Sequence, residues 1–129
     1  MANREHIESL GGVVTPFGGN GRKLGYPTAN IKIQTTQKDG IYFGFATLDK
    51  YKNQPALIFI GTPTTVGDST RRVEAHLLDI ADKDYYGLRL QLSISYFHRP
   101  PKTFKTVDDL LKAIKADERS AREWFRSQK

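Results

Sequence analysis

The stretch LRLQLSISYF, residues 88–97, alternates apolar and polar side chains over its first nine positions. Successive side chains of a β-strand point to opposite faces of the sheet. The period of two therefore predicts a strand with one apolar face, made of Leu88, Leu90, Leu92, Ile94 and Tyr96. We expect a sheet that covers a hydrophobic core.

Five other segments have the alternation or the composition of short strands. RRVEAHLLDI (71–80) alternates in the same way, and the turn residues ADKDYYG, ending in Gly87, separate it from residues 88–97. Further strands are expected in GGVVTP (11–16), TANIKI (28–33), IYFGFATL (41–48) and ALIFI (56–60). Strands at this spacing favour a sandwich or a barrel. A small closed barrel also leaves no exposed sheet edge.

The hydrophobic period changes near the end of the chain. Apolar residues recur there at i, i+3, i+4 and i+7, at Val107, Leu110, Leu111 and Ile114. Ala121 and Phe125 continue roughly the same face, and Thr106 stands where an N-cap belongs, with Asp109 three residues later. The pattern predicts one helix from about residue 107 to 125, lying against the sheet.

Composition excludes several classes of protein. At 129 residues, with 38% apolar residues, the chain is expected to be one domain, residues 1–129, with a single core. The lack of cysteine excludes a disulfide framework, a thiolate zinc site and a cysteine nucleophile. No apolar run approaches the roughly 20 residues that span a bilayer, and the N-terminus lacks a signal-peptide core. We expect a cytoplasmic protein with no membrane partner.

The net charge of +6 suggests an anionic partner, either nucleic acid or a phosphorylated small molecule. A glycine-rich segment, GGNGRKLG (18–25), could bind a phosphorylated small molecule. Glycines let backbone N–H groups approach phosphate oxygens, and Arg22 and Lys23 add positive charge. The segment is neither a Walker A motif nor a dinucleotide fingerprint. An ordinary solvated loop is the alternative.

The PTAN motif, residues 27–30, follows directly. Thr28 and Asn30 would share a face of an extended segment, and Pro27 restricts the backbone just before them. A hydroxyl and an amide oxygen are hard ligands, suited to Mg²⁺ that also binds substrate phosphates. The alternative is the start of a strand with two polar surface residues.

Glu74 and His76 lie on the face of residues 71–80 opposite Val73, Ala75 and Leu77. If that face borders a cleft, the Glu74 carboxylate could act as a general base toward a hydroxyl group. The alternatives are an exposed glutamate paired with an arginine on a neighbouring strand, and a structural role for His76.

In combination, these motifs resemble the riboflavin kinase, or flavokinase, family, which includes the C-terminal module of bacterial bifunctional FAD synthetases. The resemblance runs from about Gly12 to Arg122. Its motifs are, in order, GRKLGYPTANI (21–31), GIYFG (40–44), IGTPTT (60–65), VEAHLLDI (73–80), DYYG (84–87) and DERSAR (117–122). The PTAN motif with a downstream Glu-x-His-Leu-x-Asp segment is the specific part.

The resemblance implies a mainly β fold, a six-stranded antiparallel Greek-key barrel with a C-terminal α-helix. It implies transfer of the ATP γ-phosphoryl group to the 5′-hydroxyl of riboflavin, which yields FMN. Thr28 and Asn30 match the family residues that bind Mg²⁺ and the nucleotide phosphates, and Glu74 matches the family's catalytic base. The family's loop over ATP corresponds to Gly19, Gly21, Arg22 and Gly25, with Pro27 opening the PTAN motif. Riboflavin would lie beyond Glu74, near DYYG, HRPPKTF (98–104) and the helix.

Several positions depart from the family pattern. Phe17 stands where a glycine is usual, the IGTPTT segment lacks an arginine, and Thr65 replaces a common aromatic residue. Phe59 occupies a position that is often small or polar, and Pro101 replaces a glutamate. Because these positions cluster on the expected flavin side, they bear on acceptor affinity more than on ATP binding.

The expected partners are riboflavin and ATP, with no nucleic acid, and the expected state is a monomer. The chain offers no room for an adenylyltransferase half, so we expect FMN as the product and another chain as the source of FAD. Two alternatives stay open. One is a non-catalytic barrel of the same family that binds flavin or nucleotide, and the other is a basic barrel that binds single-stranded nucleic acid. Trp124 could pack on the barrel or lie beside the flavin.

Overall fold

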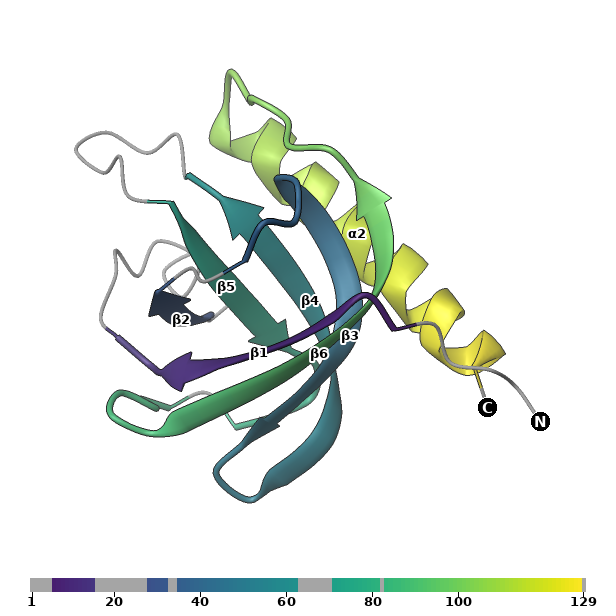
Figure 1. Cartoon of the computed structure of the whole chain (residues 1–129). Helices are drawn as coiled ribbons and strands as arrows, with labels where there is room; N and C mark the ends of the chain where they lie inside the picture. The colour runs from purple at the N-terminus through teal and green to yellow at the C-terminus, as the bar shows by residue number, and fades with distance from the viewer. Residues whose placement is uncertain (1–5, 16–27, 33–34, 63–70, 82, 129) are drawn as a thin grey trace.

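The computed structural model describes residues 6–15, 28–32, 35–62, 71–81 and 83–128 (Figure 1). These residues form antiparallel strands and one long helix. The elements are β1 (Glu8–Val13), β2 (Ala29–Lys32), β3 (Gly40–Leu48), β4 (Tyr51–Gly61), β5 (Arg72–Leu77), β6 (Arg89–Arg99) and α2 (Val107–Ser127). The strands form a six-stranded sheet in the order β1-β6-β3-β4-β5-β2. β3, β4 and β5 are successive neighbours and β6 returns beside β3, which is the Greek-key arrangement.

The two ends of the sheet meet and nearly close the barrel. Thr15, just after β1, forms an isolated antiparallel bridge with Asn30 of β2. The Thr15 backbone N–H donates to the Asn30 carbonyl oxygen at 2.8 Å. The predicted six-stranded barrel is therefore confirmed, and its seam lies at the PTAN motif.

The interior of the barrel is the main core. From β6, Leu90, Leu92 and Ile94 contribute side chains that are at most 2% exposed. From β5, Val73, Ala75 and Leu77 point into the same core, as their alternation predicts. The opposite face of β5, which carries Glu74 and His76, is therefore on the outside of the barrel.

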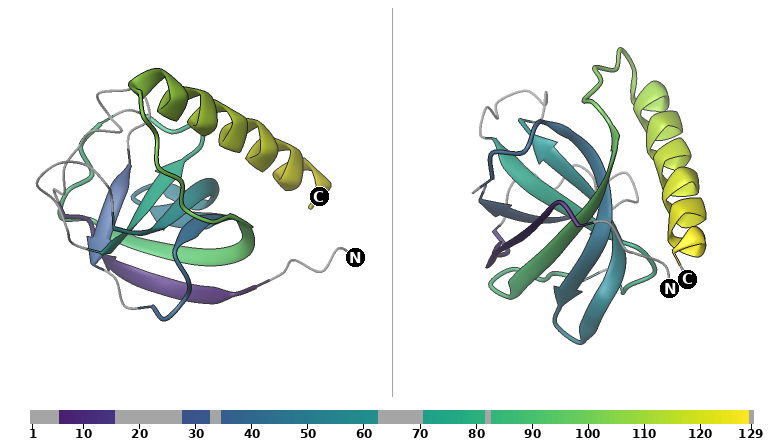
Figure 2. Two further views of the ribbon diagram at one scale, coloured as in Figure 1. Left: turned by 90° about the horizontal axis from the view of Figure 1, so that it is seen from above. Right: turned by 45° about the vertical axis from the view of Figure 1, so that its right-hand side comes forward.

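The helix α2 covers one outer face of the barrel, as both views in Figure 2 show. Thr106 is its N-cap, and its side chain accepts a hydrogen bond from the Asp109 backbone N–H at 3.0 Å, as predicted. Between α2 and the barrel lies a second cluster, made of Phe43, Phe45, Leu57, Leu78, Ala121 and Phe125. Trp124 packs against this outer cluster, which confirms a packing role for that residue.

An ion pair fixes the middle of α2 to the end of β6. Arg99 binds both carboxylate oxygens of Asp117, at 2.8 and 2.7 Å. His98 Nε2 lies 3.2 Å from Asp117 Oδ1, and the Asp117 side chain is 7% exposed.

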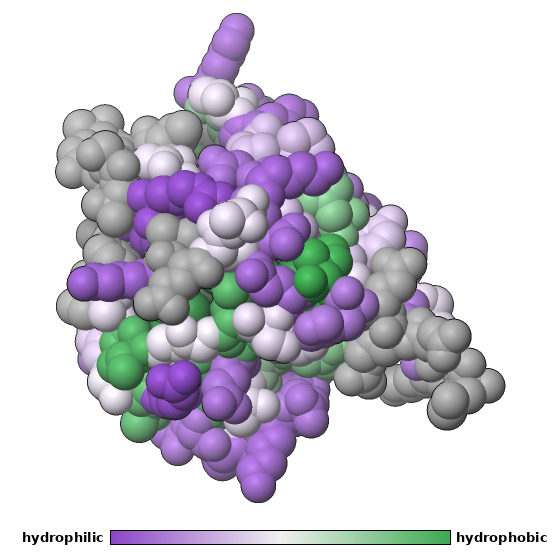
Figure 3. All heavy atoms as spheres, in the orientation of Figure 1, coloured by the Kyte–Doolittle hydropathy of each residue, from purple (hydrophilic) through white to green (hydrophobic). Residues whose placement is uncertain are grey.

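The molecular surface that faces away from α2 is largely hydrophilic, with small hydrophobic patches (Figure 3). No helix in the described part of the chain combines the length and the apolar character that crossing a membrane requires.

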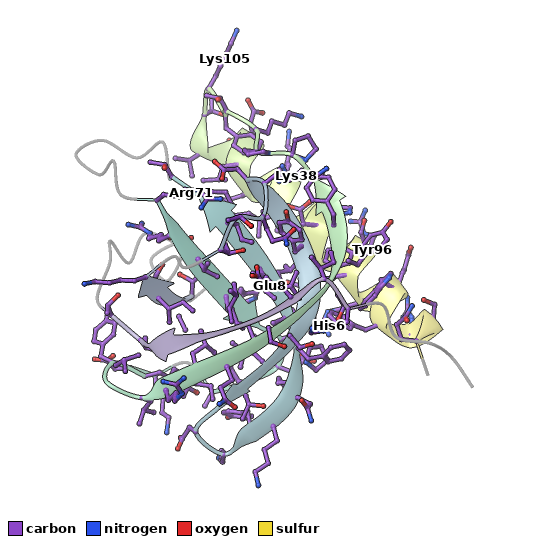
Figure 4. All side chains as sticks on the ribbon, viewed as in Figure 1. His6, Glu8, Lys38, Arg71, Tyr96 and Lys105 are labelled. Atoms are coloured by element: carbon purple, nitrogen blue, oxygen red, sulfur yellow. The ribbon has the colours of Figure 1, made fainter. Side chains whose placement is uncertain are left out.

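The prediction for Tyr96 is wrong, because β6 contains a bulge. Phe43 pairs with Tyr96 while Gly44 pairs with Ile94, so Ser95 is an extra residue on β6. The bulge reverses which face the following side chains occupy. Tyr96 stacks on Phe43 on the helix side, at 5.7 Å between ring centroids, and is 37% exposed (Figure 4). Leu88, also assigned to the apolar face, lies before β6 and is 38% exposed.

Several boundaries also differ from the predicted ones. β4 begins at Tyr51, well before the apolar run 56–60, because its first half pairs with the end of β3. β5 ends at Leu77, since Asp79 adopts a left-handed backbone conformation with φ of 62°. β1 spans Glu8–Val13, earlier than the expected 11–16, and pairs with β6 over its whole length. The helix continues to Ser127, two residues beyond the expected 125.

Candidate active site

Asn30, Glu74 and Phe59 form a row across three adjacent strands. In the strand register Asn30 of β2 pairs with Glu74 of β5, and Glu74 pairs with Phe59 of β4. Directly opposed residues of an antiparallel pair have their Cβ atoms about 4.5–5.5 Å apart and share a face. The fold therefore brings the amide of PTAN next to the carboxylate of the Glu-x-His segment, although 44 residues separate them in the chain.

The row continues toward the helix. Phe59 also pairs with Ile41 of β3, and Ile41 packs against the outer cluster beneath α2. The Glu74 side chain is 23% exposed, so its carboxylate is partly shielded but still open to a small molecule. This row, with Asn30 at one end and the helix side at the other, is the candidate active site.

Glu74 has an arginine partner, but on its own strand. The Arg72 Nε lies 3.0 Å from Glu74 Oε1, and the Arg72 side chain is only 5% exposed. Among the described residues, the direct cross-strand neighbours of Glu74 are Asn30 and Phe59, and neither is an arginine. Arg72 was missed by the reading of the sequence, although its i, i+2 spacing to Glu74 places both on one face.

Asn30 combines burial with an unpaired oxygen. The residue is 3% exposed, and within the described residues its side-chain Oδ1 has no hydrogen-bond partner. A buried polar atom without a partner costs roughly 1–3 kcal/mol, which favours a ligand that supplies the missing contact. A divalent cation or an N–H donor would do so. The Asn30 backbone is already engaged, since its carbonyl oxygen accepts from Thr15.

Thr28 and Asn30 could hold a hard cation between them. Both line one pocket, and a hydroxyl with an amide oxygen is a donor set that fits Mg²⁺ together with waters and phosphates. Among the described residues, no group of three or more His, Cys, Asp or Glu converges as a metal-binding cluster. Thr28 and Asn30 stay the predicted protein ligands for a metal at this site.

The DYYG segment shares that pocket with the PTAN motif. Tyr85 is 8% exposed and its hydroxyl donates to the Ala81 carbonyl oxygen at 2.6 Å, while Tyr86 is 49% exposed. The pocket is lined by Val14, Thr28, Ala29, Asn30, Leu48, Ala75, Leu77, Ile80, Ala81, Lys83, Asp84, Tyr85 and Tyr86. The HRPPKTF segment leads into α2 at the other end of the barrel (Figures 1 and 2). The structure thus separates two segments that the resemblance had placed around one flavin.

The glycine-rich segment and the start of PTAN lie outside the described residues, namely Gly19, Gly21, Arg22, Gly25 and Pro27. Two departures from the family pattern, Phe17 and Thr65, also lie outside them. Of the other two, Phe59 is half-buried beside Glu74, and Pro101 is exposed in the segment before α2.

The chain is similar in sequence to a family of known proteins. The family model described as riboflavin kinase matches residues 5–125, so the chain belongs to the riboflavin kinase family. It is 30% identical over 113 residues to the riboflavin kinase of Homo sapiens, covering 83% of this chain and 73% of that protein. It is 36% identical over 107 residues to the bifunctional riboflavin kinase/FMN adenylyltransferase of Escherichia coli K12, covering 81% of this chain.

The chain spans only 34% of the length of that Escherichia coli relative. The fold also matches a solved structure, the riboflavin kinase of Trypanosoma brucei, with a TM-score of 0.70 and 22% identity. That match covers 92% of this chain and 76% of the other. It confirms the predicted barrel with its C-terminal helix.

Proposed function

We propose that this protein is an ATP:riboflavin 5′-phosphotransferase. The observation that carries the proposal is the direct pairing of Asn30 with Glu74, in a chain of the riboflavin kinase family. One residue offers a buried, unpaired amide oxygen and the other a partly exposed carboxylate. Phosphoryl transfer to an alcohol requires a site for the charged phosphates and a base for the hydroxyl group, side by side.

Glu74 acts on the acceptor in this proposal. Its carboxylate accepts the proton of the riboflavin 5′-hydroxyl as the oxygen of that group forms its bond to the γ-phosphorus. The bond between the γ-phosphorus and the oxygen that bridges to the β-phosphate breaks, so that FMN and ADP result. A positioned general base contributes roughly 10²–10⁴-fold to such a rate.

Thr28 and Asn30 serve the donor. They are the residues that would hold Mg²⁺, and the unpaired Asn30 Oδ1 supports that assignment. The ion, when bound, supplies neutralisation of the negative charge on the phosphate oxygens. The glycine-rich segment with Gly19, Gly21, Arg22, Gly25 and Pro27 remains the proposed cover for the phosphates.

The two substrates would approach the row from different sides. We place the nucleoside part of ATP in the pocket with Tyr85 and Tyr86, because that pocket reaches Thr28 and Asn30. The flavin then lies on the helix side, where Phe59 adjoins Glu74 and where α2 offers half-buried apolar residues, Leu110, Leu111 and Ile114. This division assigns DYYG to the nucleotide rather than to the flavin.

The test is FMN formation by the purified chain with riboflavin, ATP and Mg²⁺, resolved by chromatography. We expect FMN from the unmodified chain and a loss of at least tenfold in Asn30→Ala, because that variant lacks the amide oxygen. Asn53→Gly is the matched control, since Asn53 is an exposed asparagine of β4 whose φ of 50° suits glycine. Flavin binding without FMN in the unmodified chain would favour a non-catalytic binding barrel instead.

The proposal extends to the form in which the chain works, a single-domain, cytoplasmic monomer that needs Mg²⁺. Light scattering at assay concentration tests the monomer, and activity after chelation and re-addition of Mg²⁺ tests the metal. A dimer, or full activity in the presence of a chelator, would overturn that part alone.

A further inference from the structure

Arg72 is a charged residue in an unusual place for its type. It is 4% exposed, although arginine is rarely this buried unless it is paired. Its Nε donates to Glu74 Oε1 at 3.0 Å, from two residues earlier on β5. The two side chains share the outer face of that strand, so the contact follows from the strand geometry itself.

The contact limits how the Glu74 carboxylate can point. A glutamate side chain has several rotatable bonds, and a base works only when its oxygen is aimed at the hydroxyl proton. A charge-assisted hydrogen bond from a guanidinium group holds one carboxylate oxygen in a defined place. Burial of Arg72 makes this anchor more rigid than a pair between two exposed side chains would be.

Arg72 does not lie directly opposite Asn30, the residue at the phosphate end of the site. Its partners in the strand register are Lys32 of β2 and Gly61 of β4, whereas Asn30 is opposite Glu74. Among the described site residues, Glu74 is the one that accepts a hydrogen bond from Arg72. This placement favours an action on the carboxylate over a direct contact with the nucleotide.

We propose that Arg72 is a positioning residue, which orients the Glu74 carboxylate toward the acceptor hydroxyl group through the Nε–Oε1 hydrogen bond. The role of the carboxylate as base rests on the proposed function. The hydrogen bond does not, so the two can be tested separately.

Kinetics test the positioning role. Arg72→Gln should lower kcat about 10- to 100-fold, the usual effect of losing a group that orients a working ligand or base. The KM values for ATP and riboflavin should change less than about threefold, because an interaction needed only for the reaction step acts on kcat. Arg72→Lys should recover part of the lost kcat, since it keeps a cation beside Glu74.

A neighbouring arginine provides the matched control. Arg71 donates from Nε to Asp39, and its terminal nitrogens donate to the carbonyl oxygens of Thr35 and Gln37. It thus ties segment 35–39 to the barrel, and these three hydrogen bonds of its side chain go to segment 35–39 and not to Glu74 (Figure 4). Arg71→Gln should lower the unfolding temperature without the selective loss of kcat. If Arg71→Gln and Arg72→Gln lose kcat in the same proportion to their loss of stability, the role of Arg72 is structural and the proposal is wrong.

A double-mutant cycle separates action through Glu74 from action on the phosphates. If Arg72 works through the carboxylate, Arg72→Gln should cause no further loss in a Glu74→Gln background. A full additional loss there, or a rise in the KM for ATP with kcat unchanged, would overturn the proposal and assign Arg72 to the nucleotide.

The hydrogen bond can be measured without any catalysis. In the ¹⁵N spectrum of the free protein, the Arg72 Nε–H resonance should be visible and protected from exchange with water. It should shift and lose protection in Glu74→Gln, and keep both in the control Glu123→Gln, whose side chain is exposed on α2. An Arg72 resonance unaffected by Glu74→Gln would overturn the proposal even if FMN is made. If no FMN is made, the same spectrum still decides whether the anchor exists.

Discussion

Replacement of Gly44 by alanine should destabilise the barrel strongly, because β3 and β6 approach each other at this residue. A Cβ atom on Gly44 would lie 2.2 Å from the Ser93 carbonyl oxygen, 3.0 Å from Ile58 Cδ1 and 3.1 Å from Ile94 Cα. Two of these three atoms belong to the β6 backbone beside the bulge, so rotation of a side chain cannot relieve those two contacts. The strands would have to separate.

The size of the effect follows from those contacts. Overpacking a well-packed core costs about 1–3 kcal/mol, and each ladder hydrogen bond stretched beside the bulge adds about 1 kcal/mol. We expect a loss of about 3 kcal/mol in the free energy of unfolding. For a domain of this size that corresponds to a fall in Tm of roughly 10–15 °C.

Urea unfolding at 25 °C, followed by far-UV circular dichroism, measures this loss directly. Gly11→Ala is the matched control on β1, because the nearest atom to its added Cβ is Arg89 Nη2 at 3.1 Å, the end of a flexible side chain. We expect Gly11→Ala to stay within about 0.5 kcal/mol of the unmodified chain. A Gly44→Ala variant as stable as that control would refute the close approach of β3 and β6.

Two further predictions concern ion pairs, and a third concerns the riboflavin side of the site. The hydrogen bond from Arg122 lowers the pKa of Asp79 below the ordinary value of an aspartate, 3.8, so the pair should contribute stability above about pH 4 and lose it as the pH falls further. Because the Asp79 side chain is 66% exposed, Asp79→Asn should cost at most about 1 kcal/mol at pH 7 by urea midpoints, and this cost should shrink as the pH falls below 4. Arg99→Met removes the bidentate partner of the buried Asp117 and should cost about 3 kcal/mol; a Tm unchanged by that variant would mean that α2 does not depend on this contact. Phe59→Ser should raise the KM for riboflavin about fivefold, by loss of an aromatic contact worth roughly 1 kcal/mol, and a change in the KM for ATP instead would place Phe59 on the donor side.

The alternation of side chains predicted most of the barrel because it is a local property. Leu90, Leu92 and Ile94 are interior, as the period of two requires, and the helix begins after its predicted cap at Thr106. The bulge at Ser95 could not be foreseen in this way. It depends on the approach of β6 to Gly44, a contact between residues about 50 positions apart in the chain.

The candidate site, too, depends on contacts between distant residues that local sequence patterns do not show. The motifs around Asn30 and Glu74 were recognisable, yet their direct pairing is a property of the β2–β5 register and not of either motif. Arg72 shares a strand face with Glu74 through its i, i+2 spacing, but a cation at the start of a strand carries no local signal that the two side chains are in contact. Its burial, which is what makes the contact with Glu74 notable, exists only in the folded barrel.

The central claim is that Glu74 takes part in phosphoryl transfer, and single-turnover kinetics test it most directly. With enzyme in excess over riboflavin and with saturating ATP and Mg²⁺, rapid-quench measurement of FMN gives the rate constant of the transfer step without product release. The account predicts that Glu74→Gln slows this step by roughly 10²–10⁴-fold, while riboflavin still binds and Glu123→Gln transfers at the normal rate. Equal rate constants in Glu74→Gln and the unmodified chain would contradict it.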